Sequence, residues 1–193
     1  MKMKLLSIVW MLSLTCVLAS MHTWHSLSFK APKPNEVLSF LKPNTDLNAI
    51  HFISEGCSCS IHLINHLLER GPHQKISEKV IILGNLKKRA KELSMKGYLV
   101  DSISYQDAYE NEYFSATPLL VVYDKNKSIE YMGGYTENTI TPLSKIYDLE
   151  IYKTALTDSK KKTYPIKGCA NSKNIQQLID PFGLKYRRQN ELI

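Results

Sequence analysis

Apolar and polar positions change along the chain in blocks, and these blocks predict strands and helices in alternation. Short apolar runs have the length and composition of buried strands, at 49–54, 79–83, 98–103, 119–123 and 128–132. Stretches with apolar residues three and four positions apart predict helices at 57–70, 86–96 and 137–156, and an irregular helix at 105–114. Because the first strands alternate with helices, we expect them to lie parallel, with helices on both faces of the sheet. The last two strands flank turn-forming residues and predict a hairpin, which makes the sheet mixed.

Two cysteines lie where the first predicted strand passes into the first predicted helix. Cys57 is expected in the first turn of that helix, where unpaired backbone N–H groups and the helix dipole stabilise a thiolate and lower the thiol pKa. A helical projection places Cys59, His62 and His66 together on the polar side, opposite the apolar side. We therefore expect this helix to pack by one face and to present sulfur and imidazole on the other.

The first thirty residues have the pattern of an export signal. Lys2 and Lys4 precede an apolar run, and the next charged residue is Lys30. A basic start followed by an apolar stretch is typical of a secretory signal, and about 20 apolar residues are enough to span a bilayer. We expect residues 5–24 to be retained as a single anchor in the inner membrane, although cleavage after Ala19 would release a secreted protein. Since the lysines stay on the cytoplasmic side, the rest of the chain is expected in the periplasm.

Three cysteines lie beyond this segment, namely Cys57, Cys59 and Cys169. In an exported protein, a sparse and odd set of cysteines indicates working thiols more than a stapling framework. Cys169 belongs to an extension at 157–193 and lies just before a helix predicted at 173–179. The alternative for Cys169 is a small buried residue without chemistry, a frequent fate of free cysteine.

The charge and length of the chain limit its class. The net charge of the 193 residues is +7, and three of the lysines fall in the first thirty residues. The remainder carries about +4 without an aromatic-interleaved basic patch, so nucleic-acid binding finds no support. Roughly 165 residues remain after the signal segment, which is enough for one domain with a sizeable core and too few for two. We predict a signal anchor or signal peptide at 1–28, a proline-containing linker at 29–47, one domain at 48–156 and the extension.

The tetrad at 57–60 has the sequence CSCS and resembles the C-x-x-C active site that opens the first long helix of thioredoxin-like proteins. The first cysteine matches, Ser60 stands at the usual resolving position, and a second thiol occupies the third position. The chain is most similar to the membrane-tethered bacterial proteins of the TlpA and RedB-like kind, which present a redox domain to the periplasm. Some RedB-like chains share C-x-C-S, a histidine seven residues after the second cysteine, here His66, and a late Gly-Cys pair, here Gly168 and Cys169.

A proline strengthens the same resemblance. Thr117 and Pro118 directly precede a predicted strand, the place at which the thioredoxin fold has a cis-proline facing its cysteines. The resemblance covers residues 48–156. It implies an α/β thioredoxin-like fold, with a central mixed sheet flanked by helices and a cis Thr117–Pro118 bond beside Cys57.

Three functions are open at this point. The first is a thiol-disulfide oxidoreductase that acts on protein disulfides, in which Cys57 attacks and Cys59 or Cys169 resolves the mixed disulfide. The second is a copper-binding or copper-delivery protein of the Sco-like kind, with Cys57, Cys59 and His66 or His62 as ligands, because thiolates favour Cu(I). The third is a redox-inactive binding module, which would explain the serine of the tetrad but leave three cysteines without a role.

We expect Cys169 to lie within reach of the 57–59 turn. A serine hydroxyl cannot resolve a mixed disulfide, so that step needs another thiol. Cys59 is always near, but a C-x-C disulfide closes a small ring whose geometry is strained, whereas a cysteine on a separate segment avoids that strain. The sequence leaves open which of the two cysteines pairs with Cys57.

Overall fold

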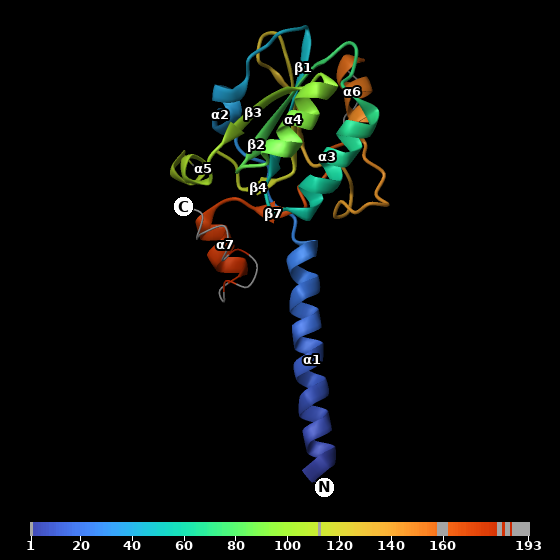
Figure 1. Ribbon diagram of the computed structural model, residues 1–193, viewed down its shortest axis with the longest axis vertical. Helices are drawn as coiled ribbons and strands as arrows, with labels where there is room; N and C mark the ends of the chain where they lie inside the picture. The colour runs from blue at the N-terminus through green and yellow to red at the C-terminus, as the bar shows by residue number, and fades with distance from the viewer. Residues whose placement is uncertain (1, 112, 158–161, 181–182, 184–185, 187–193) are drawn as a thin grey trace.

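A five-stranded sheet forms the centre of the fold in the computed structural model, which describes residues 2–111, 113–157, 162–180, 183 and 186 (Figure 1). The strand order is β3-β2-β1-β5-β6, with β1 at Leu47–Ser54, β2 at Ser77–Leu83, β3 at Leu99–Ile103, β5 at Leu119–Asp124 and β6 at Ile129–Gly133. β1, β2 and β3 run parallel, whereas β5 and β6 are antiparallel to their neighbours. The sheet is therefore mixed, and its strands lie within two residues of the apolar runs that predict them.

Helices cover both faces of this sheet. Alternate side chains of the strands enter two apolar clusters, because successive residues of a strand point to opposite faces. Ile53 packs with Leu67 in one cluster, and Phe52 packs with Tyr105 in the other. The first face is covered by α3 (Ser58–Arg70), α4 (Lys87–Lys96) and α6 (Asp148–Leu156). The second is covered by α2 (Pro34–Val37), the 3-10 helix η1 (Leu38–Phe40) and α5 (Tyr105–Asn111). The arrangement is the thioredoxin-like α/β fold that the resemblance implies.

The C-terminal extension returns to the domain and adds a second, two-stranded sheet. β4 (Ala116–Thr117) pairs antiparallel with β7 (Cys169–Ala170), and α7 (Lys173–Ile179) follows (Figure 1). Upstream of β7, the Gly134 N–H donates to the Tyr164 carbonyl at 2.9 Å, and the Phe29 N–H donates to the Ile166 carbonyl at 2.8 Å. The extension is thus tied to the domain by backbone hydrogen bonds well before it reaches β4.

The prediction of one helix over 137–156 is wrong in its first half, because α6 begins only at Asp148. Thr141 and Ser144 make local hydrogen bonds instead: the Thr141 N–H donates to Ser144 Oγ at 2.9 Å, and the Ser144 N–H donates to the Thr141 carbonyl at 3.1 Å. Such side-chain bonds offer the backbone an alternative to the helix, and Pro142 between them has no N–H to contribute. The segment is consequently an irregular loop that lies near the start of α3.

The N-terminal helix α1 (Lys2–Ser26) extends away from the domain (Figure 1). Large apolar side chains of this helix are exposed, from Leu6 to Leu18. Within the part of the chain that the structure describes, no helix is both long enough and apolar enough to cross a membrane. The membrane span predicted over residues 5–24 is therefore not supported by the structure.

Candidate active site

The turn between β1 and α3 places Cys57 at the start of a helix. Gly56 has a φ of 73°, a left-handed conformation that suits glycine, and it redirects the chain as the strand ends. Cys57 is the N-cap residue, with φ −97° and ψ 113°, and its carbonyl accepts the first helical hydrogen bond from Ile61. The sulfur therefore lies beside the free N–H groups of the first helical turn, as the sequence predicts.

Thr117 and Pro118 lie against this cysteine. The Thr117–Pro118 peptide bond is cis, as the resemblance implies. Cys57 Sγ is 3.9 Å from the Thr117 carbonyl oxygen, to which the protonated thiol donates. The structure thus brings three of the predicted site residues together, although 60 positions separate Cys57 from Thr117.

Strand β7 adds Cys169 to the same site. Cys169 is paired directly opposite Thr117 in the two-stranded sheet. This register brings its thiol within hydrogen-bonding reach of Cys57 Sγ, and Cys59 reaches the same sulfur from the first turn of α3. No disulfide joins these three described cysteines. The register and the hydrogen bonds thus bring Cys57, Cys59 and Cys169, called the sulfur cluster below, to one place in the fold, as expected for Cys169.

The sulfur cluster gives Cys57 and Cys59 different pKa values. A hydrogen bond from Cys169, followed by one from Cys59, lowers the pKa of Cys57 well below its ordinary value, and the backbone and hydroxyl groups of Ser60 act in the same direction. Burial opposes this effect but does not outweigh it. The hydrogen bond to Cys57 raises the pKa of Cys59, with burial and the nearby Cys57 charge adding to the rise. Cys57 is thus the thiol of this pair that ionises, and Cys59 stays a donor.

Cys59 is not on an exposed face, contrary to the helical projection. Cys59 is buried beneath the loop that precedes α6, and the backbone of Ile140 hydrogen-bonds to its sulfur. Ser60 is fully buried, and its hydroxyl accepts the Ser54 N–H at 3.0 Å. The projection misses this burial because it considers a single helix, whereas the loop before α6 covers the start of α3.

The two histidines of α3 do not join the sulfur cluster. His66 Nε2 lies 3.1 Å from Asp148 Oδ1, and that carboxylate also accepts from Arg70 at 2.8 Å. His62 is half-buried further along the same helix. In the described ranges, no group of three or more histidine, cysteine, aspartate or glutamate residues could hold a metal ion. Copper binding by Cys57 and Cys59 with a histidine therefore finds no support in the geometry.

Two residues of the site were not anticipated from the sequence, Ser54 and Asn171. Ser54 Oγ lies 2.6 Å from Thr117 Oγ1, and Thr117 Oγ1 donates to Asn171 Oδ1 at 3.3 Å. Because a threonine has one hydroxyl proton, donation to Asn171 makes Ser54 the donor to Thr117. A polar residue ending an otherwise apolar strand was the available signal for Ser54. These bonds fix the Thr117 side chain between β1 and the extension.

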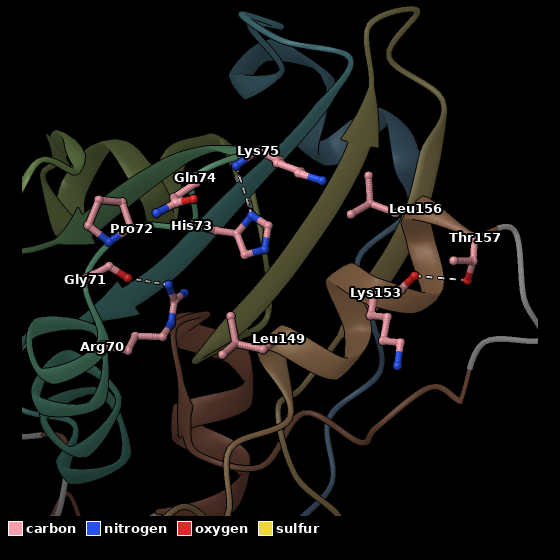
Figure 2. A pocket seen from close by; sticks show the side chains of 10 residues that line it. All are labelled: Arg70, Gly71, Pro72, His73, Gln74, Lys75, Leu149, Lys153, Leu156 and Thr157. Atoms are coloured by element: carbon pink, nitrogen blue, oxygen red, sulfur yellow. Dashed lines mark hydrogen bonds between the residues drawn. The ribbon is translucent and has the colours of Figure 1, made fainter.

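A cleft of about 580 Å³ lies at the opposite end of α3 from the cysteines (Figure 2). It is bounded by the loop after α3 and by α6, and Lys75 and Lys153 are among its lining residues. Arg70 forms part of its wall, but its guanidinium is held by Glu78 at 3.0 Å and Asp148 at 2.8 Å. None of the described cysteines lines this cleft, so it is separate from the sulfur cluster.

Comparison with known proteins bears on the fold. A scan against protein-family models found no match, and no curated protein matched either. A hypothetical protein from Sinorhizobium meliloti 1021 is similar with a TM-score of 0.52 and 13% identity, over 76% of this chain and 91% of that one. A thioredoxin-like protein from Aeropyrum pernix has a TM-score of 0.40 and 13% identity, over 76% and 97% of the two chains. A domain of a possible thiol-disulfide isomerase from Cytophaga hutchinsonii has a TM-score of 0.35 and 16% identity, over 70% and 95%. At such identities the likeness concerns the fold alone.

Proposed function

We propose that this protein catalyses thiol-disulfide exchange with protein disulfides, using Cys57 as the nucleophile. The observation that carries the proposal is the sulfur cluster, in which two thiols donate to a third at the start of a helix. A thiolate is the attacking form in disulfide exchange, and hydrogen-bond donors with a helix N-terminus are what stabilise it. The lowered pKa of Cys57 makes that form available without an external base.

The exchange proceeds in two balanced steps. The Cys57 thiolate attacks one sulfur of a substrate disulfide, so that a Cys57–substrate bond forms and the other substrate sulfur leaves as a thiolate that takes a proton from solvent. A second thiol of the protein then gives up its proton and attacks Cys57 Sγ, and the remaining substrate sulfur leaves and is protonated. The substrate disulfide is reduced to two thiols, and two protein thiols are oxidised to a disulfide. An external dithiol restores the protein, and a partner of higher potential drives the same steps in reverse.

Cys169 is the better resolving thiol. The disulfide that Cys59 would form with Cys57 closes a small, strained ring. Cys169 approaches from a separate strand and reaches the same sulfur. We assign resolution to Cys169 and a donor role to Cys59.

The place of action is part of the proposal. The basic start and apolar run of residues 1–28, together with the exposed apolar side chains of α1, support export of the domain to the periplasm. Cell fractionation of the full chain and of a chain lacking residues 1–28 tests this. We expect only the full chain outside the cytoplasm, and an equal distribution of both would refute export by this segment.

A single-turnover assay tests the chemistry. The reduced full-length protein is mixed with a peptide disulfide, and the products are separated without reductant and identified by mass. We expect Cys57→Ser to give no reaction, Cys169→Ser to accumulate the Cys57 mixed disulfide, and the matched control Cys59→Ser to release product and form a Cys57–Cys169 disulfide. Exchange by Cys57→Ser at the wild-type rate would refute the assignment of the nucleophile, and release by Cys169→Ser would reassign resolution to Cys59.

A further inference from the structure

The reactive sulfur is sealed from solvent in this structure. Cys57 is 0% exposed, Cys59 is 3% exposed and Cys169 is 5% exposed. Disulfide exchange requires a substrate sulfur to come into bonding contact with the attacking thiolate, and access limits its rate. A group that covers Cys57 must therefore move before an external protein disulfide can react.

Strand β7 brings Cys169 against this sulfur, and its backbone pairing with the domain is short. β7 pairs with β4 over two residues, and just beyond the pair the Asn171 N–H donates to the Ser115 carbonyl at 2.8 Å. Together, β4 and β7 form a sheet of their own, separate from the five-stranded one. Without β7, β4 would present an unpaired backbone edge beside Cys57, and such an edge accepts an extended polypeptide as a new strand.

Gly168 shows how closely this strand follows the site. A Cβ atom at this position would overlap the Thr117 carbonyl oxygen and would lie 2.8 Å from Pro118 Cδ. The backbone immediately before Cys169 therefore rests directly on Thr117 and Pro118, with no room for a side chain. Any strand that takes this path, with its cysteine opposite Thr117, meets the same restriction.

We propose that β7 occupies the docking position of the substrate, and that the substrate is an extended polypeptide segment carrying glycine immediately before its reactive cysteine. This inference rests on the proposed exchange function and names its substrate class. The substrate segment displaces β7, pairs antiparallel with β4, and brings its disulfide to Cys57. With Cys169 withdrawn, Cys59 and Ser60 remain as the hydrogen-bond donors that lower the pKa of Cys57. The bonds of Tyr164 and Ile166 lie outside the displaced pair, so the extension can stay attached upstream while β7 is released.

β7 and the substrate strand compete for one position on β4, and this competition couples resolution of the mixed disulfide to product release. While the mixed disulfide exists, the substrate strand lies on β4 and keeps Cys169 away from Cys57. When β7 returns, it replaces the substrate strand and delivers Cys169 to the Cys57–substrate bond in the same movement. The attack of Cys169 on Cys57 Sγ then breaks that bond, and the substrate thiol leaves from a site that β7 already fills.

The covering role is tested by the alkylation of Cys57 in the reduced full-length protein, assigned to this residue by peptide mass mapping. Gly168→Ala adds a Cβ that overlaps Thr117, and overpacking of this kind costs enough to raise the open population, and hence the alkylation rate, by about tenfold to a hundredfold. Lys167→Ala is the matched control in the same segment, and we expect its rate to equal that of the wild type. Equal rates for Gly168→Ala and Lys167→Ala would overturn the covering role.

Hydrogen exchange of the wild-type protein gives the same test without a variant. The Asn171 amide, bonded to Ser115, should exchange at least about tenfold faster than the amides of β1 and β5, because opening at β7 is local and leaves the central sheet intact. Exchange of the Asn171 amide at the slow rate of the central sheet would contradict a displaceable strand, even if Gly168→Ala failed to fold.

The substrate class is tested with two disulfide-linked peptides that differ only before the attacked cysteine, one with glycine and one with alanine. We expect kcat/KM to favour the glycine peptide by about tenfold or more, since the alanine Cβ meets the same overlap. Equal values would overturn the glycine requirement. Absence of exchange with both peptides, combined with fast alkylation of Gly168→Ala, would refute the proposed exchange function and leave β7 as a removable cover. These two failures are thus distinguishable.

Discussion

Replacing Cys169 by alanine should make Cys57 a weaker acid. The hydrogen bond from Cys169 is the largest of the effects that lower the pKa of Cys57. A hydrogen bond to a charged group contributes roughly 1.5–3 kcal/mol, and about 1.4 kcal/mol corresponds to a tenfold change in an ionisation equilibrium. The ionisation constant of Cys57 should therefore fall by about tenfold to a hundredfold in Cys169→Ala, so that its thiolate fraction rises only at higher pH than in the wild type. Thiolate absorbance in the ultraviolet, followed over pH in the reduced protein, measures this fraction directly and needs no access for a reagent.

Two further variants calibrate that titration. Cys59→Ala removes the hydrogen bond with the second-largest effect on the pKa of Cys57, and it should shift the titration of Cys57 in the same direction by a smaller amount. Cys169→Ser keeps a hydroxyl donor and should shift it less than Cys169→Ala does. If the Cys57 titration in Cys169→Ala overlays that of the wild type, the hydrogen bond across β4 and β7 does not stabilise the thiolate, and the reasoning is refuted.

Three other outcomes are expected. Because the pKa of Cys57 is lowered in the folded state, its thiolate stabilises the fold above the usual thiol pKa, and this contribution is lost as pH falls through the lowered pKa. The free energies of unfolding of wild type and Cys57→Ser, measured in urea, should therefore converge at low pH. Free energies that stay parallel over pH would contradict this. Arg70→Met leaves the buried carboxylates of Glu78 and Asp148 without their guanidinium and should cost about 3–5 kcal/mol in chemical denaturation, with Lys153→Met in the nearby cleft as an inert control. Ser60→Ala removes the acceptor of a buried Ser54 N–H and should lower the free energy of unfolding by about 1–3 kcal/mol, while product release continues. Loss of product release with stability unchanged would make Ser60 a participant in resolution.

The loss of stability in Arg70→Met should depend on pH in a defined direction. Burial acts to raise the pKa of Asp148, but the hydrogen bond from His66 and the charge of Arg70 outweigh it and lower that pKa. The ionised carboxylate therefore stabilises the fold at neutral pH, and the stabilisation is lost as pH falls through the lowered pKa. The difference between wild type and Arg70→Met should shrink in the same range, and a difference that is constant with pH would contradict the ion pair as its cause.

The sequence by itself determined the elements of the central fold. β1 is buried at every position, and its largely apolar run, interrupted at its centre by His51, was a sufficient signal for a strand covered on both faces. Cys57 at the start of α3 and Pro118 at the start of β5 followed from local patterns of the same kind. The helix at 173–179 was also predicted at its observed bounds. These features depend on residues within one or two turns of each other, so the local pattern of apolar and polar residues is enough to predict them.

Only the tertiary structure decided how the site is closed. The pairing of β4 with β7 involves two residues on each strand, too few to show a period, and it joins segments 52 positions apart at Thr117 and Cys169. The burial of Cys59 follows from the loop before α6, which Thr141 and Ser144 hold out of the helix that its sequence pattern predicts. His66 contacts Asp148 and does not share a site with the cysteines. Each outcome depends on contacts between distant segments, whose free energies no local pattern contains, and these contacts bring three scattered thiols together around one sulfur.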